Sequence, residues 1–167
     1  MLYTPMTQKA MRLAYAAHHG QTDQSGVPYI FHPFHVAESV CGAMPKEEVV
    51  CAALLHDVLE DTSLSLSELE QEFPKEVTRA VELLTHIPEE NYFDYIKRLK
   101  KNPIARQVKI MDLRHNMDMT RLNGCKGATG EQKRCRGGKY EKALAILLDS
   151  GAKQDEKEDF SISMESL

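Results

Sequence analysis

Apolar residues recur at intervals of three and four along most of the chain, which is the spacing of amphipathic helices. The first run follows Thr4-Pro5, a capping residue with proline at the first helical position, and stops at Gly20. Further helices are predicted from Pro33 to about Ala43, from Pro45 to about Asp61, from the capping box at Ser65, from Pro74 through Leu84, over 92–101, over about 104–119 and over 131–149, with a break or kink at Gly137-Gly138. Alternating runs typical of strands are nearly absent. The pattern therefore predicts an all-α fold, a helical bundle.

The chain of 167 residues fits a single domain. Residues 1–150 carry the helical pattern, whereas 151–167 are acidic and serine-bearing and are predicted to form a flexible tail. No apolar run approaches the roughly 18–20 residues of a membrane span, and the N-terminus lacks a signal-peptide pattern. The four cysteines form no C-x-x-C pair, which argues against a thiolate zinc site. We expect a cytoplasmic protein with no membrane partner.

The net charge of -4 hides an uneven distribution. Residues 97–142 hold 14 Lys or Arg and 4 Asp or Glu, a local balance of +10, while the rest of the chain is acidic. The acidic remainder argues against a nucleic-acid partner, but a local basic segment suits a small, phosphate-rich molecule. A solvated helix face is the alternative explanation of the same segment. The composition says nothing about the oligomeric state.

The first candidate for chemistry is a group of polar residues that ends an apolar helical run. His56 and Asp57 follow AALL, and Glu60 and Asp61 come three and four positions after Asp57. Asp57, Glu60 and Asp61 are spaced i, i+3, i+4, so three carboxylates share one helix face. Such like charges repel one another unless a cation relieves them or one carboxyl keeps its proton. A helix end opening into water is the alternative, but acids at a helix C-terminus oppose the macrodipole.

Two other segments offer metal ligands. His32 precedes Pro33 where a loop becomes a helix, and Asp112 lies one turn before Asn116 on a helix with an apolar stripe. Taken alone, each fits an ordinary structural role. Together with His56 and Asp57 they supply two imidazoles and two carboxylates, a mixed set that suits Mn²⁺, Fe²⁺, Zn²⁺ or Mg²⁺. Four ligands on a metal that prefers six leave positions for water and a phosphate oxygen.

Four segments occur in a characteristic order: AHHGQ at 17–21, SGVPYIFHP at 25–33, ALLHDVLEDT at 53–62 and VKIMDLRHN at 108–116. In this order they resemble the HD superfamily of metal-dependent phosphohydrolases. The resemblance is closest to the hydrolase domain of RelA/SpoT-type alarmone enzymes and their small single-domain relatives. It covers roughly residues 5–148 and implies an HD-domain helical bundle.

The resemblance implies a role for each matching residue. One Mn²⁺ would be bound by His32, His56, Asp57 and Asp112. Glu60 and Asp61 would position or activate the attacking water. The substrate would be contacted by Asn116, Arg136 and Tyr140, with Lys109 in the same basic segment. The implied reaction removes pyrophosphate from the 3′ position of guanosine 3′,5′-bis(diphosphate), (p)ppGpp, a step of the stringent response.

The chain departs from the family pattern at Asp23, where family members carry a basic residue, usually Arg. The loss of a cation and gain of an anion there predict weaker binding of a polyanion, by about 1–3 kcal/mol if the site is close. Two alternatives therefore stay open: an HD hydrolase of another nucleotide or phosphoester, and a non-catalytic nucleotide-binding regulatory module. The acidic pair at Glu60 and Asp61 argues against the second, because a binding module has no evident use for it.

Overall fold

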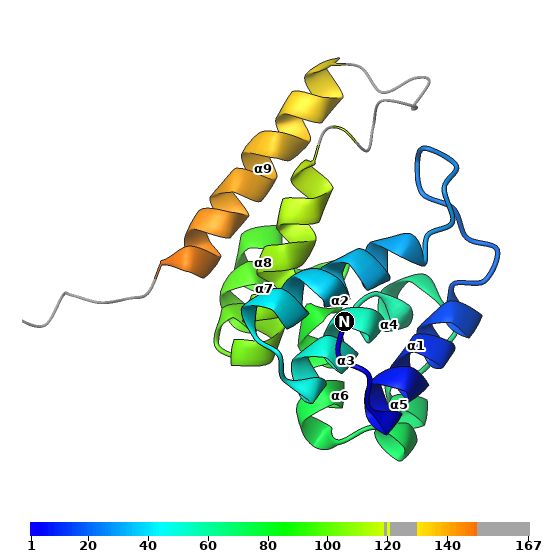
Figure 1. Ribbon diagram of the computed structural model, residues 1–167. Coiled ribbons are helices and arrows are strands. Elements are labelled where there is room, and N and C mark those ends of the chain that lie inside the picture. Colours follow the sequence, from blue (N-terminus) through cyan, green and yellow to red (C-terminus); the bar gives the residue numbers. More distant parts are fainter. Residues whose placement is uncertain (119, 121–129, 150–167) are drawn as a thin grey trace, which may run out of the picture.

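The computed structural model describes residues 1–118, 120 and 130–149, apart from the side chains of 130–137 (Figure 1). The described elements are α1 (Pro5–Ala17), α2 (Phe31–Ala43), α3 (Glu47–Leu55), α4 (Val58–Asp61), α5 (Leu66–Glu72), α6 (Lys75–Leu84), α7 (Tyr92–Lys100), α8 (Pro103–Met117) and α9 (Gly130–Leu148). Across these described ranges the β-structure consists of one isolated bridge, between Thr22 and Pro28. The prediction of an all-α bundle is confirmed. Among the described helices, none combines the length and apolar character needed to cross a bilayer.

Helix α3 is the centre of the bundle. Every side chain from Val49 to Leu55 is buried, and α1, α2, α6 and α8 pack around the helix. Each fully buried Leu or Val contributes about 1.5–3 kcal/mol of transfer free energy. Because the buried part of α3 is apolar on all sides, the first polar side chain in this part of the core comes directly after the last residue of the helix. That side chain is His56, and it lies between α2 and α8.

Two helix starts follow the predicted local chemistry. Thr4 and Thr7 form a reciprocal capping box at the start of α1, and Ser65 forms one with Glu68 at the start of α5. Helix α2 starts at Phe31, slightly earlier than predicted, which places His32 and Pro33 in its first turn. Proline is tolerated there because the first-turn amides have no partner within the helix.

The prediction of one helix from Pro45 to Asp61 is wrong. The chain forms two helices, α3 and α4, with a turn at His56 and Asp57 between them. The Nδ1 atom of the buried His56 lies 2.7 Å from the carbonyl oxygen of Ala53, and this contact competes with the regular helical hydrogen bonds. In a continuous helix successive side chains diverge by about 100°. At this turn the two side chains meet, with Nε2 of His56 2.9 Å from Oδ2 of Asp57.

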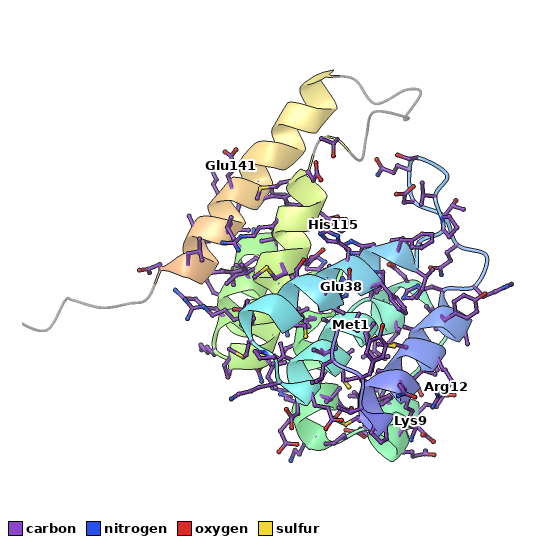
Figure 2. All side chains as sticks on the ribbon, in the orientation of Figure 1. Met1, Lys9, Arg12, Glu38, His115 and Glu141 are labelled. Atoms are coloured by element: carbon purple, nitrogen blue, oxygen red, sulfur yellow. The ribbon has the colours of Figure 1, made fainter. Side chains whose placement is uncertain are left out.

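Helix α9 packs against α7 and α8 on one side of the bundle (Figure 1). Ala143 and Leu147 are buried there, and the Arg106 Nε–H donates to the carbonyl oxygen of Leu147 at 2.6 Å. The helix runs without interruption through Gly137-Gly138, so the predicted break is wrong. Glycine costs a helix roughly 1 kcal/mol per residue, and the buried contacts of α9 at Ala143 and Leu147 lie farther along the same helix. Figure 2 shows Glu141 on the outer side of this helix and Arg12 on the outer side of α1, whereas Lys9 of α1 pairs with Glu72 of α5.

The predicted domain spans 1–150, with a flexible tail at 151–167. The tail lies outside the described residues. The domain limits therefore stay a prediction.

Candidate metal centre

Four side chains from three parts of the fold converge beside the C-terminal end of α3. His32 comes from α2, His56 and Asp57 from the turn after α3, and Asp112 from α8. The Nε2 atom of His32 lies 3.2 Å from that of His56 and 3.2 Å from Oδ1 of Asp112. The His56 Nε2 is 2.9 Å from Oδ2 of Asp57. The structure thus brings together all four residues predicted as ligands.

These spacings fit a divalent cation. Ligand atoms at about 2.0–2.2 Å from a metal and at right angles to each other lie about 2.8–3.1 Å apart. Three of the spacings above are between 2.9 and 3.2 Å, and the remaining His–Asp spacings, 3.6 and 3.9 Å, suit wider ligand–metal–ligand angles. Nitrogen and carboxylate oxygen donors without thiolate are typical of Mn, Fe, Zn or Mg sites. The donors present therefore fit the metal that the sequence predicts.

The imidazole tautomers also suit ligation through Nε2. The His56 Nδ1 lies 2.7 Å from the Ala53 carbonyl oxygen, which only accepts, so Nδ1 carries the proton. The His32 Nδ1 lies 2.7 Å from Nδ1 of His115, and donation from His32 would leave its Nε2 lone pair facing the other ligands. Metal-binding histidines commonly donate their second N–H in this way.

The electrostatic field at the centre favours positive charge. Burial would lower the pKa of His56, but the charges of Asp57 and Asp112 raise it to about 9. Burial would raise the pKa of Asp57, and the adjacent His56 lowers it to about 2. The half-buried Asp57 and the buried Asp112 therefore stay ionised in this pocket and supply the charge that a divalent cation would neutralise.

Asp112 is held by its own helix. The Lys109 ammonium lies 2.8 Å from its Oδ2 atom, and the Asn116 amide donates to Oδ1 at 2.5 Å. Burial would raise the pKa of Asp112, but the charge of Lys109 keeps it well below its usual value. Lys109 also lies 5.5 Å from the centre of the buried Tyr95 ring. Both of these predicted substrate-binding residues thus contact a metal-ligand candidate.

Tyr29 and His115 support the centre from outside the predicted ligand set. The Tyr29 hydroxyl donates to Oδ2 of Asp57 at 2.5 Å, and its ring lies between those of His18 and His32. His115 stacks on His32 with ring centres 4.9 Å apart. Both residues stand in the motifs identified from the sequence, but spacing alone gave no sign of these contacts, which cross 28 and 83 residues of chain.

The acidic pair lies on the short helix α4, directly after Asp57. Two neighbouring loops contact it: the His86 backbone N–H donates to Oε2 of Glu60 at 3.1 Å, and the Gln21 amide donates to the Asp61 carbonyl oxygen at 2.8 Å. Burial and the charge of Asp57 raise the pKa of Asp61. The structure therefore places both acids next to the ligand cluster, with each attached to a different loop.

Asp23 stabilises the loop between α1 and α2. Its Oδ1 atom accepts hydrogen bonds from the backbone N–H groups of Ser25 at 2.8 Å and Val27 at 3.0 Å. Gly26 between them has φ of +81°, a conformation that favours glycine. A carboxylate at this position therefore has a local structural purpose that an arginine side chain could not serve.

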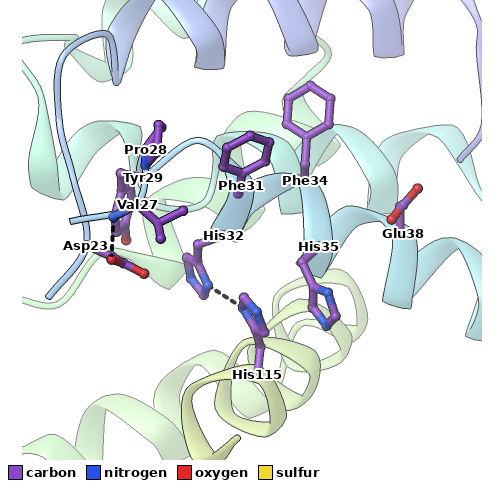
Figure 3. Close-up of a pocket in the computed structure, with 10 residues that line it drawn as sticks. All are labelled: Asp23, Val27, Pro28, Tyr29, Phe31, His32, Phe34, His35, Glu38 and His115. Carbon is purple, nitrogen blue, oxygen red and sulfur yellow. Dashed lines mark hydrogen bonds between the residues drawn. The ribbon is translucent and has the colours of Figure 1, made fainter. Parts of the chain in front are cut away.

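A pocket of about 490 Å³ opens beside His32, between this loop, α2 and α8 (Figure 3). Figure 3 shows the His32 and His115 rings joined by a hydrogen bond, with His35 beside His115; the His35 and His115 ring centres are 3.9 Å apart. Tyr29 and Phe31 line the same pocket. Its volume lies in the range of roughly 300–1,000 Å³ that is typical of small-molecule sites.

Several cations of the basic segment are engaged within the fold. Lys97 pairs with Asp94, Arg98 with Glu90 and Lys100 with Asp149. Part of the +10 balance is therefore structural. Tyr140 lies half-buried on α9, whereas the side chain of Arg136 falls outside the described residues, so the contacts of Arg136 stay a prediction.

Comparison with known proteins places this fold in a family. The model of the HD domain family matches residues 10–119. The chain is 36% identical over 131 residues to the bifunctional (p)ppGpp synthase/hydrolase SpoT of Escherichia coli K12, covering 69% of this chain and 19% of that protein. It is 33% identical over 118 residues to the guanosine-3′,5′-bis(diphosphate) 3′-pyrophosphohydrolase of Aquifex aeolicus, covering 66% of this chain and 17% of that protein.

A solved structure described as "a metazoan ortholog of SpoT hydrolyzes ppGpp and plays a role in starvation responses" superposes with a TM-score of 0.78. The two chains are 25% identical, and the match covers 91% of this chain and 90% of that one. The chain therefore belongs to the HD domain family, with homology to the SpoT/RelA (p)ppGpp hydrolases. It spans about a fifth of the length of the curated relatives described above.

Proposed function

We propose that the protein is a metal-dependent phosphohydrolase that removes pyrophosphate from the 3′ position of (p)ppGpp. The observation that carries the proposal is the cluster of His32, His56 and Asp57 at ligand spacing, with Asp112 3.2 Å from His32 and an acidic pair on the helix that follows. The names of the relatives, including the Aquifex 3′-pyrophosphohydrolase, support this choice of substrate. The same proposal places the protein in the cytoplasm, where nucleotides of this kind are found.

The four converging residues would hold one Mn²⁺. Imidazole donors favour a transition metal over Mg²⁺, and carboxylates favour Mn²⁺ over softer ions. A divalent cation held there would act as a Lewis acid and stabilise the charge that develops on the phosphate oxygens. Lys109 would keep Asp112 ionised, and Tyr29 would fix the orientation of Asp57.

Glu60 and Asp61 would handle the proton of the attacking water. Because the His86 N–H already binds Oε2 of Glu60, the Oε1 atom is the oxygen that would accept this proton. A carboxylate aligned in this way is an effective general base. The water oxygen would bond to the phosphorus next to the 3′ oxygen, and the bond between the 3′ oxygen and this phosphorus would break. The 3′ oxygen would leave as the 3′ hydroxyl, taking up one proton, and the pyrophosphate would carry the oxygen of the water.

The substrate would lie between the metal centre and α9. The 490 Å³ pocket beside His32 is large enough for part of a nucleotide. Asn116 and Lys109 would stand close to the phosphates, and Arg136 and Tyr140 would reach the ribose and the 5′ side. We propose a small phosphorylated nucleotide, rather than a nucleic acid, as the partner.

Hydrolysis of another nucleotide is the second candidate, and Asp23 is the observation that favours it. This carboxylate lines the pocket and adds negative charge where a polyanion would bind. The two candidates are separated by incubating the purified protein with Mn²⁺ and (p)ppGpp or a nucleotide panel. Pyrophosphate from (p)ppGpp supports the first candidate, inorganic phosphate from another nucleotide supports the second, and no release from any compound would refute both.

Metal removal gives a direct prediction. Dialysis against EDTA should abolish hydrolysis, and Mn²⁺ should restore it more strongly than Mg²⁺, because the donor cluster contains the imidazoles of His32 and His56. The measurement is the initial rate after titration with each ion. Full activity after removal of all detectable metal would contradict the proposed chemistry.

Asp23→Asn separates charge from loop structure. Asparagine keeps the Oδ1 acceptor for Ser25 and Val27 but removes the negative charge, so kcat/KM for a polyanion should rise about 2–5-fold at low ionic strength. The gain should shrink in high salt. Glu76→Asn, on the exposed start of α6, is the matched control and should change neither value. Equal kcat/KM for Asp23→Asn and wild type at low salt would show that Asp23 does not repel the bound substrate.

A further inference from the structure

The loop between α6 and α7, residues 85–91, reaches across to the candidate acid Glu60. The His86 backbone N–H donates to Oε2 of Glu60 at 3.1 Å. The two residues are 26 positions apart, so the orientation of the carboxylate depends on the shape of a loop outside the HD motif. Ile87 and Glu89 in this loop are exposed, and burial therefore contributes little to holding its shape.

One guanidinium group on α7 fastens the loop on both sides of His86. The Arg98 Nε–H donates to Oε1 of Glu90 at 2.9 Å and an Nη2–H donates to Oε2 at 2.8 Å, a bidentate pair. The same Nη2 lies 3.3 Å from the Thr85 carbonyl oxygen and donates to it. The His86 ring forms a further contact within the loop, because its Nε2 lies 3.0 Å from the Glu90 carbonyl oxygen.

Arg98 is itself fixed against the core. Its guanidinium carbon lies 5.5 Å from the centre of the Tyr95 ring, and this ring is buried. The Tyr95 hydroxyl donates to the carbonyl oxygen of Leu84, at the end of α6. A continuous set of contacts thus runs from the bundle core through Arg98 to the loop and its His86 N–H.

We propose that the Arg98–Glu90 ion pair positions Glu60 for water activation, through the His86 N–H. Arg98 and Glu90 are positioning residues, since neither touches the ligand cluster. An aligned N–H binds one carboxylate oxygen and leaves the other directed at the water. A misplacement of about 1 Å can cost roughly 100-fold in rate. The Arg98–Glu90 pair is half-buried at the surface, and ion pairs near the surface add little to global stability. This inference rests on the proposed hydrolase function, because it assigns Glu60 to catalysis.

The test uses charge reversal. Arg98→Glu should lower kcat about 10-fold, leave KM and metal content unchanged, and shift Tm by less than about 4 °C. Glu90→Arg should behave similarly. The double variant, in which the two charges are exchanged, should have a kcat at least threefold higher than either single variant. Lys97→Glu, on the same helix and paired with the exposed Asp94, is the matched control and should keep the wild-type kcat.

A second measurement keeps the inference separate from the proposed function. In the metal-free protein, the ¹⁵N–¹H resonance of the His86 amide should move toward its solvent-exposed position in Arg98→Glu, and should return in the double variant. If the wild-type protein is inactive but the amide responds in this way, the hydrolase function is refuted, whereas the structural link from Arg98 and Glu90 to the His86 amide is retained. The positioning role of the Arg98–Glu90 pair would be refuted by an unchanged His86 amide resonance or an unchanged kcat in Arg98→Glu. A double variant with a kcat no higher than that of the single variants would refute it as well. If Arg98→Glu does not fold, Glu90→Gln replaces it and should give the same changes at smaller size.

Discussion

Asp57→Ala should yield a folded protein that no longer retains a metal ion. The Oδ2 atom of Asp57 lies within 2.9 Å of His56 Nε2 and 3.6 Å of His32 Nε2, at the centre of the ligand cluster. Its loss removes one of the two carboxylates of the ligand cluster. Loss of a group that merely supports a ligand already costs about 10–100-fold in metal affinity, so loss of a ligand should cost more. Elemental analysis after dialysis measures the result.

The control for this variant is Asp94→Ala, which removes an exposed carboxylate paired with Lys97. It should keep the wild-type metal content. The circular dichroism spectrum of Asp57→Ala should match wild type, because helices α3 and α4 are held by apolar burial. Stoichiometric metal in the dialysed Asp57→Ala protein would show that Asp57 is not a ligand.

Glu60→Gln should keep its metal and lose about 10²–10⁴-fold in turnover, the usual contribution of a general base. Glutamine has the shape of glutamate, and its Oε1 atom can still accept the hydrogen bond from His86. It cannot take a proton from water, so the loss should fall on kcat. Single-turnover rates with saturating substrate, together with metal analysis of the same sample, measure the effect.

Glu82→Gln provides the comparison, because this glutamate forms an exposed pair with Arg79 on α6 and should keep full activity. Asp61→Asn completes the set. A near-normal rate for Glu60→Gln together with a large loss in Asp61→Asn would move the base to Asp61. Near-normal rates in both variants would remove the acidic pair from the mechanism.

Local chemistry predicted most of the helices. The capping residues Thr4 and Ser65 act over three positions, so their effect is visible in the sequence. Two predictions failed for tertiary reasons. The turn at His56 depends on a buried imidazole that bonds the Ala53 carbonyl, and the continuity of α9 through Gly137-Gly138 accompanies packing against α7 and α8.

The ligand candidates were identifiable because metal chemistry restricts the residue types, and the structure brings His32, His56 and Asp112 together from three helices or helix ends. The supporting contacts were not identifiable in the same way. Arg98, in the last turn of α7, and Glu90, just before this helix, look like any charged pair in the sequence. Their link to Glu60 passes through the backbone N–H of His86. A backbone donor leaves no trace in residue identity, so only the fold reveals it.

The most direct test of the central claim is the product ratio from guanosine 3′,5′-bis(diphosphate) incubated with the Mn²⁺-loaded protein. Hydrolysis at the 3′ position should give one GDP and one pyrophosphate for each substrate molecule consumed, with the 5′ diphosphate intact, and none of either with the Asp57→Ala protein. Release of inorganic phosphate, cleavage at the 5′ side, or no consumption of the substrate would contradict the proposed function.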